Sequence, residues 1–199
     1  MKSLRLVLSI VLMSLSTVVF AKSGAQEPVA LPDASKPVAP ADAPKAVALS
    51  DAQKSFNQLK KLAGTWEGRV STFPPQAAIE GKPMQVSFRV TSMGNALMHE
   101  MTGAGRPDDP ITMLYLDGDR LLLTHYCDAG NRPRMEAKAS PDGKTVEFDF
   151  LDVAGSTKYG HMHHAVFTFL DANHHTEDWA FVVKGDKQVR AHVDLLRTK

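Results

Sequence analysis

The sequence lacks the features that would assign it at once to a common functional class. Its single cysteine cannot form an intramolecular disulfide, and no Cys-x-x-Cys pair is present for structural zinc or redox exchange. Because 23 Lys and Arg balance 22 Asp and Glu, no excess of positive charge is available to neutralise the phosphates of a nucleic acid. A Gly-rich phosphate loop, a Gly-x-Ser-x-Gly elbow and a His-Glu-x-x-His helix are all missing, which excludes the commonest nucleotide, esterase and zinc-protease motifs.

The first 21 residues have the pattern of a secretory signal peptide. Lys2 and Arg5 form a cationic start, an apolar stretch follows, and Val19-Phe20-Ala21 supplies a cleavage site with small residues. The apolar stretch has about 15 residues, whereas a membrane-spanning helix needs roughly 20. We therefore expect cleavage after Ala21 and a soluble periplasmic or secreted protein with no transmembrane segment.

Residues 22–49 have the composition of a disordered linker. Eight alanines and five prolines occupy 13 of these 28 positions, and no aromatic residue is present. Proline at this frequency opposes both helix and sheet, so the segment is predicted to be an extended tether. The folded domain is expected over residues 50–199.

The domain begins with a predicted short helix and continues with strands alone. Ser50-Asp51-Ala52-Gln53 fits a capping box, and Phe56, Leu59 and Leu62 fall on one helical face. The hydrophobic period then changes to two. Ten strands are predicted at about 64–73, 83–93, 95–103, 110–117, 119–127, 132–139, 143–152, 161–170, 174–184 and 187–197.

The predicted connections alternate between tight hairpins and longer loops. Tight turns are expected at residues 93–95, 117–119, 140–143 and 171–173, where Gly, Asn, Asp and Pro gather. In an antiparallel meander every second connection lies at the same end, so one end is closed and the other is a mouth. Closing ten strands into an up-and-down barrel removes both exposed edges, and we therefore predict an all-β, ten-stranded antiparallel β-barrel.

Gly64-Thr65-Trp66, at the start of the first strand and after a short helix, resembles the Gly-x-Trp signature of lipocalins and their calycin relatives. The resemblance implies a barrel whose closed end is covered by the helix. It also implies that a cation from the last strand, here Arg197, lies over Trp66. Such a cation–π contact contributes about 0.5–2 kcal/mol.

The whole segment from Leu62 onward also resembles a group of uncharacterised bacterial exported proteins with a lipocalin-like domain. The matching strings are residues 62–68, 123–127, 131–135 and 161–163. The group has no settled activity, so this resemblance implies only the fold. Nitrobindin-like haem barrels share the ten-stranded calycin architecture and carry their haem-ligating histidine near the end of the chain. His192 is the one candidate for that role, but its neighbours' alternation assigns it to the outer face.

Several polar or sulfur-containing residues share the apolar, inward parity of their strands. These candidate ligand-binding residues are His99, Met101, His125, Cys127, Met135, His161, His163 and Glu177. Tracing the meander places all of them except Glu177 in the mouth half of the barrel. We expect them to line the cavity near its entrance.

His125-x-Cys127 and His161-x-His163 each place two possible metal ligands on one face of a strand. Cysteine suits soft metals such as copper(I), and imidazole suits copper or zinc. The two pairs lie three strands apart, about 14 Å along the wall, so they converge on one ion only if the barrel is strongly curved. A polar pocket lining without a metal is therefore the competing interpretation.

Three functions remain open from the sequence. The leading hypothesis is an exported carrier or sensor that binds a small apolar or amphipathic ligand, held near the entrance by His125, His161 and His163. The second is a metal-binding barrel that uses those histidines and Cys127, with haem less favoured than copper or zinc. The third is an isomerase- or cyclase-type enzyme of the lipocalin fold, since a histidine at the mouth can transfer protons near neutral pH.

Overall fold

The structure is a computed structural model that describes residues 48–198 except 105–108, 141, 184 and 186. The predicted signal peptide and almost all of the predicted linker lie outside the described residues. No helix within the described residues is long and apolar enough to cross a membrane.

Within the described residues, one α-helix, α1 (Asp51–Lys60), precedes the strands. The Ser50 side chain caps it by accepting a hydrogen bond from the backbone N–H of Gln53, as the capping box predicts. The Gln53 side chain does not reciprocate; it donates to Asn57 Oδ1 at 3.0 Å instead. Phe56 and Leu59 are buried, so the predicted apolar face of the helix packs on the barrel.

Ten strands follow, joined by short connections, with one 3₁₀ turn, η1 (Ser92–Gly94), after the second strand. The strands are β1 (Gly64–Phe73), β2 (Pro83–Thr91), β3 (Ala96–Gly103), β4 (Ile111–Asp117), β5 (Arg120–Tyr126), β6 (Arg132–Ala139), β7 (Thr145–Ala154), β8 (His161–Asp171), β9 (His174–Val183) and β10 (Lys187–Arg197). Each strand pairs antiparallel with the next, and β10 pairs with β1. The predicted closed ten-stranded barrel is confirmed.

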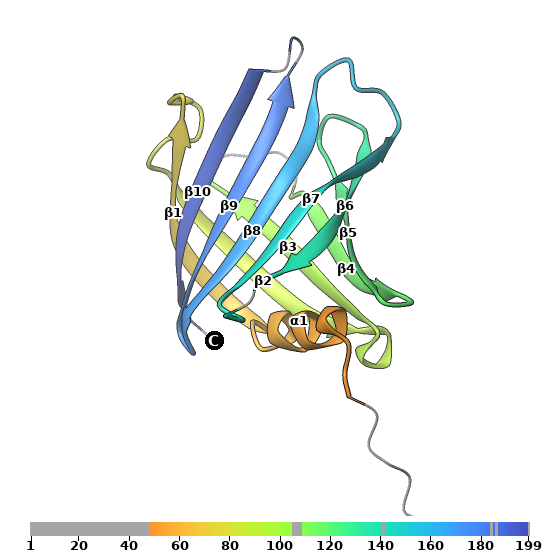
Figure 1. Cartoon of the computed structure of the whole chain (residues 1–199). Helices are drawn as coiled ribbons and strands as arrows, with labels where there is room; N and C mark the ends of the chain where they lie inside the picture. Colours follow the sequence, from red (N-terminus) through yellow and green to blue (C-terminus); the bar gives the residue numbers. More distant parts are fainter. Residues whose placement is uncertain (1–47, 105–108, 141, 184, 186, 199) are drawn as a thin grey trace, which may run out of the picture. The chain divides into compact units, whose positions relative to one another are not determined.

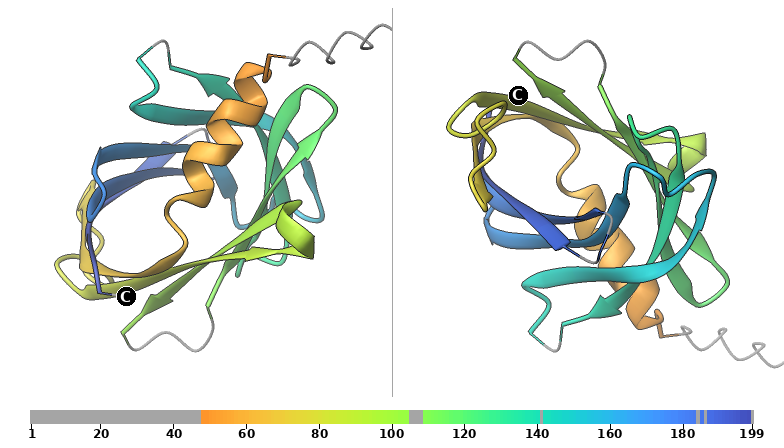
Figure 2. Two further views of the ribbon diagram at one scale, coloured as in Figure 1. Left: turned by 90° about the horizontal axis from the view of Figure 1, so that it is seen from below. Right: turned by 90° about the horizontal axis from the view of Figure 1, so that it is seen from above.

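The tight connections β2–β3, β4–β5, β6–β7 and β8–β9 lie at the end of the barrel where α1 sits (Figure 1). Figure 2 shows α1 running across this end when the barrel is viewed from below. The longer connections lie at the other end, which is the mouth. There the Asn131 side chain donates to the carbonyl oxygens of Ser156 and Gly160, both at 2.8 Å, and so ties the β5–β6 connection to the β7–β8 connection.

The predicted contact between Trp66 and Arg197 is present at the closed end. The guanidinium carbon lies 4.0 Å from the centroid of the buried indole ring. The guanidinium also donates to the carbonyl oxygens of Lys61, Ala63 and Ala172. Arg197 therefore joins the segment after α1, the β8–β9 turn and the last strand in one contact.

Gly68 allows β1 and β10 to pair where they close the barrel. A Cβ atom at this position would lie 2.0 Å from the carbonyl oxygen of Asp194 on β10. Any side chain here would push the two strands apart, so the closure of the barrel requires glycine.

The interior of the barrel is arranged in layers of paired residues. One apolar layer consists of Leu97, Leu114, Leu123 and Met135, which are partners across β3, β4, β5 and β6. The next layer toward the mouth consists of Phe88, His99, Thr112 and His125, across β2 to β5. All eight residues are buried, so the sheet carries polar side chains into its core directly above an apolar layer.

Register shifts interrupt β6, β7 and β8 near the mouth. In β8 the pairing with β9 skips one residue between Met162 and His164. The pairing between β7 and β8 extends only from Thr145 and Thr168 to Asp149 and His164. Within the described residues, the end of β7 beyond Asp149 therefore pairs with β6 alone.

Candidate functional site

A cavity of about 280 Å³ opens into the mouth half of the barrel. Most of the described residues that line it are apolar, and none of these is a lysine or arginine. They are Val70, Ile79, Met84, Met101, Pro110, His125, Cys127, Asp128, Ala129, Met162, Trp179, Phe181, Ala191 and Val193. An apolar concavity with a few polar groups is the usual form of a small-ligand site.

His125 and Trp179 give this cavity its most deeply buried aromatic surfaces, with exposures of 1% and 4%. Their ring centroids lie 5.7 Å apart. His125 Nδ1 shares a hydrogen bond of 2.8 Å with the hydroxyl of Thr112, which orients the imidazole. Together the two rings form a floor, beneath which the core continues.

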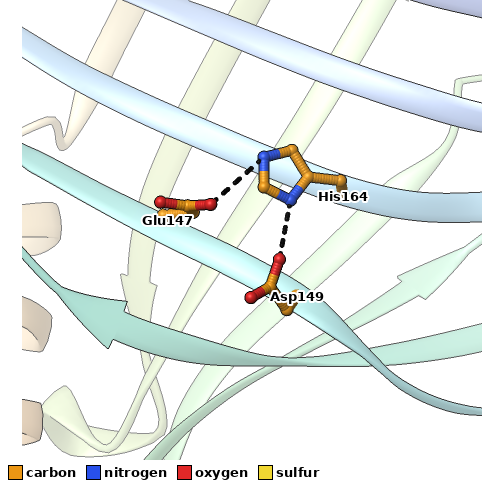
Figure 3. A group of neighbouring side chains, drawn as sticks. All are labelled: Glu147, Asp149 and His164. Atoms are coloured by element: carbon orange, nitrogen blue, oxygen red, sulfur yellow. Dashed lines mark hydrogen bonds and ion pairs between the residues drawn. The ribbon is translucent and has the colours of Figure 1, made fainter.

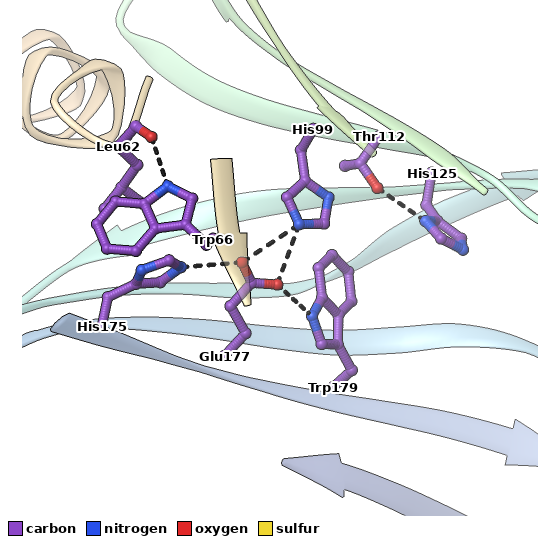
Figure 4. Close-up of polar contacts among 8 residues, drawn as sticks. All are labelled: Leu62, Trp66, His99, Thr112, His125, His175, Glu177 and Trp179. Carbon is purple, nitrogen blue, oxygen red and sulfur yellow. Dashed lines mark hydrogen bonds and ion pairs between the residues drawn. The ribbon is translucent and has the colours of Figure 1, made fainter. Parts of the chain in front are cut away.

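A buried cluster lies beneath this floor, centred on the Glu177 carboxylate (Figure 4). His99 Nε2 donates to the carboxylate, with distances of 3.0 and 3.2 Å to its two oxygens. His175 Nε2 donates at 3.1 Å and Trp179 Nε1 at 3.0 Å. The side chains of Glu177, His99 and His175 have no exposed surface, so the donors replace the water that the carboxylate loses.

The electrostatics of the cluster favour an ionised Glu177. Burial alone would raise the pKa of this carboxyl group, but the charge of His99 and the hydrogen bonds from His175 and His99 outweigh it. The pKa of Glu177 is held well below its ordinary value as a result. Nδ1 of His99 and Nδ1 of His175 have no hydrogen-bond partner, so each imidazole is anchored through Nε2.

Six of the predicted site residues face inward as expected, but they lie at different depths of the barrel. Met101, His125 and Cys127 line the cavity, whereas His99 and Glu177 belong to the buried cluster beneath it. Met135 is also buried, but it pairs with Leu123 in the apolar layer toward the closed end and does not line the cavity. The expectation that Met135 lies at the mouth is corrected by this register.

His161 and His163 do not line the cavity with His125 and Cys127, contrary to expectation. The extra residue in β8 shifts the alternation, so Met162, the partner of the cavity residue Phe181, occupies the inward position instead. The two histidines lie against Phe150, with ring centroids 4.8 and 4.6 Å from it, and 3.3 Å separates His161 Nε2 from His163 Nδ1. Burial, and then the charge of His163, lowers the pKa of His161.

His175 belongs to this cluster, although it is not among the candidate site residues predicted from the sequence. It lies toward the closed end, where its ring packs edge-on against Trp66 with centroids 4.3 Å apart. The sequence signal was available: His175, Glu177 and Trp179 alternate along β9 and share one parity. Trp179 is also absent from the predicted site residues, although it lines the cavity.

His192, the position that the nitrobindin-like resemblance implies for a haem ligand, lies on the outer face. Its Nδ1 is 2.7 Å from Asp178 Oδ1, and it does not line the cavity. The residues of this chain therefore do not fit a haem held in that manner.

A separate group of possible metal ligands lies on the outer face of β7 and β8 (Figure 3). Glu147, Asp149 and His164 are the described residues of the His, Cys, Asp and Glu types whose ligand atoms lie within 4.8 Å of one another. His164 Nδ1 is 3.0 Å from Asp149 and Nε2 is 3.7 Å from Glu147. Lys138 already pairs with Asp149 and, with its hydrogen bond as the main cause, lowers the pKa of that carboxyl group. The group is thus satisfied as a half-exposed network of ion pairs.

Comparisons with protein-family models and with curated proteins give no match. The fold is similar to that of Rv2717c from M. tuberculosis, with 14% identity and a TM-score of 0.53 over 73% of this chain and 98% of that one. It is also similar to a DUF3598-family protein of unknown function from Nostoc punctiforme, with 13% identity and a TM-score of 0.50. That match covers 71% of this chain and 49% of the other, so this chain spans about half of its length. At these identities the similarity shows the fold, a lipocalin-like ten-stranded barrel.

Proposed function

We propose that this protein is an exported carrier or sensor that binds a small, largely apolar ligand in the cavity at the mouth of the barrel. The observation that carries the proposal is the cavity itself, about 280 Å³ in volume and lined mainly by apolar side chains, with His125 and Trp179 at its floor. The apolar walls supply affinity, and the imidazole supplies one polar contact of fixed direction.

The size of the cavity limits the class of ligand. Pockets for drug-sized molecules span about 300–1,000 Å³, so this one suits a small aromatic ligand near the lower end of that range. A ligand that buries as much surface as one aromatic side chain buries about 150–250 Å². At about 25 cal/mol per Å² this gives about 4–6 kcal/mol. The corresponding dissociation constant lies between about 1 mM and about 50 μM.

A carrier or sensor function is supported by the position of Glu177. Its carboxylate is fully buried and bonded to the indole N–H of Trp179, which itself lines the cavity. A general base must come within hydrogen-bond reach of the proton that it removes. Glu177 is therefore suited to holding Trp179 in place, and we expect a bound ligand to be recovered unchanged.

The test is titration of the purified protein with N-phenyl-1-naphthylamine, an apolar probe whose emission rises out of water. Wild type is expected to bind one molecule. Ala191→Phe fills the cavity from β10 and should weaken binding at least about tenfold, a loss of about 1.4 kcal/mol. Ala154→Phe, at the exposed end of β7, is the matched control and should bind as wild type does. Equal binding by all three proteins would refute the cavity as the site.

Export is tested by the mass of the protein recovered from the cell that produces it. Cleavage after Ala21 predicts a mature chain that starts at Lys22. Native mass spectrometry of the same sample, compared with the denatured protein, also weighs any ligand carried along. A chain that retains residues 1–21 would refute the export part of the proposal and leave the ligand-binding part standing.

A further inference from the structure

Sulfur-containing side chains gather on the cavity. Met84 on β2, Met101 on β3, Met162 on β8 and Cys127, directly after β5, all line it. They comprise three of the seven methionines between residues 48 and 198 and the single cysteine of the chain. Among the described residues of the lining, none is a lysine or an arginine.

The barrel register places two of these sulfurs at the same height. His99, Thr112 and His125 form one inward layer, and Met101 and Cys127 each lie two residues further toward the mouth. Pro110, whose carbonyl oxygen accepts a hydrogen bond from the backbone N–H of Met101, lies between them, directly before β4. Two strand steps separate their backbones by about 10 Å. Methionine is unbranched with three rotatable bonds, so its sulfur can reach across such a gap.

We propose that the cavity binds one soft monovalent metal ion of the Cu(I) class through Cys127 Sγ and the thioether sulfurs of Met84 and Met101, which lie on the neighbouring strands β2 and β3. Thiolate and thioether donors suit soft ions such as Cu(I) and disfavour the hard ions Mg²⁺ and Ca²⁺. On binding, a bond forms between Sγ and the ion while the thiol proton leaves to solvent.

This ligand set differs from the set predicted from the sequence, because it keeps Cys127 and replaces His125, His161 and His163 with Met84 and Met101. It also differs in chemistry from the outer group of Glu147, Asp149 and His164, whose oxygen and nitrogen donors suit a divalent ion. The two places can therefore be told apart by the metal used. The proposal goes beyond the binding of an organic ligand and does not depend on it.

The experiment titrates the reduced protein, purified from a producing cell, with Cu(I) in competition with bicinchoninate, and with Ag(I) in chloride-free buffer. Wild type is expected to bind one ion. Cys127→Ser should weaken binding at least about tenfold, and Met101→Leu should weaken it about three- to tenfold. Met113→Leu is the matched control, because Met113 is a half-buried residue of β4 that does not line the cavity. It should bind within about twofold of wild type.

Two outcomes would overturn the proposal. One is that wild type competes no better than Cys127→Ser; the other is that Met101→Leu and Met113→Leu weaken binding equally. His164→Ala should retain Cu(I) binding, and a loss of Cu(I) in that variant would assign the ion to the outer face and so also refute the site.

Competition with the apolar probe separates this proposal from the previous one. A bound Ag(I) ion should displace N-phenyl-1-naphthylamine from wild type, because both would occupy the cavity. Probe binding without any Cu(I) or Ag(I) binding refutes the metal site alone. Metal binding without probe binding supports the metal site and refutes the apolar-ligand function.

Discussion

Replacing Glu177 with Gln tests whether the buried cluster is an energetic unit of the fold. The carboxylate accepts hydrogen bonds from His99, His175 and Trp179, all within 3.2 Å. A glutamine side chain has the same shape as glutamate but only one acceptor oxygen. Its amide N–H groups would face one of the three donors, and that donor would lose its acceptor. Hydrogen bonds to charged groups contribute about 1.5–3 kcal/mol each, and a buried donor left unsatisfied costs about 1–3 kcal/mol.

The neutral amide recovers part of this loss, because it relieves the desolvation of a buried charge. We therefore expect a net destabilisation of about 3 kcal/mol in Glu177→Gln. For a domain of this size that corresponds to a fall in melting temperature of about 6–12 °C. The assay is urea unfolding followed by circular dichroism, with calorimetry for the melting temperature.

The control is Glu136→Gln, which removes an exposed ion pair with Arg120. Exposed pairs contribute about 0–1 kcal/mol, so this variant should be nearly as stable as wild type. If Glu177→Gln lowers the free energy of unfolding no more than the control, the cluster is not a stabilising unit and the reasoning is refuted.

The same variant predicts a change in the pH dependence of stability. The pKa of Glu177 is lower in the folded state than its ordinary value of 4.5, so the folded protein binds fewer protons there than the unfolded chain. Its contribution is present above about pH 4.5 and is lost as the pH falls toward the folded pKa. Wild type should therefore lose stability below about pH 4.5 more steeply than Glu177→Gln does. Parallel profiles would contradict the lowered pKa.

Three further predictions concern Arg197 at the closed end, Asn131 at the mouth and His161 at the start of β8. Arg197→Ala removes the cation–π contact and three hydrogen bonds to carbonyl groups, and should cost about 1–3 kcal/mol in urea unfolding. Asn131→Ala removes the two hydrogen bonds that hold the loop from Ser156 to Gly160. A protease should therefore cleave this loop faster, while the melting temperature of the protein changes little. Because the pKa of His161 is lowered in the folded state, the unfolded chain takes up its proton first as the pH falls. Wild type should lose stability below about pH 6.5, and His161→Gln should show a flatter profile between pH 5 and 7 in thermal melts.

The strands could be predicted because the alternation of apolar and polar residues and the positions of the turn residues indicate the same strand boundaries. Gly118 has a φ of +60°, and the Asp-Gly-Asp turn predicted at residues 117–119 joins β4 to β5 as expected. The second strand was predicted two residues too long. Ser92 and Met93 have positive φ values of 52° and 54°, so the chain leaves the strand in a 3₁₀ turn. Neither position is a glycine or proline, so neither residue type indicates that the strand ends there.

The candidate site was predictable only where the alternation is unbroken. On β9 the parity of Trp179 correctly placed Glu177 inside, and on β3 the parity of Leu97 correctly placed His99. On β8 one extra residue beside Met162 exchanges the inner and outer faces of the strand. The predicted cavity residues His161 and His163 therefore do not line the cavity. Such a bulge depends on how neighbouring strands pair, which the local sequence does not specify.

The layering of the interior decides what the cavity can recognise. The ionised Glu177 carboxylate accepts hydrogen bonds from His99, His175 and Trp179, and the Trp179 ring separates it from the cavity. The cavity itself presents apolar, aromatic and sulfur surfaces, with the His125 imidazole and the Asp128 carboxylate as polar groups among its described lining residues. The cavity can therefore recognise a ligand by its shape and by apolar and sulfur contacts. The Glu177 carboxylate takes no part in this recognition, because its hydrogen bond holds the Trp179 ring in place.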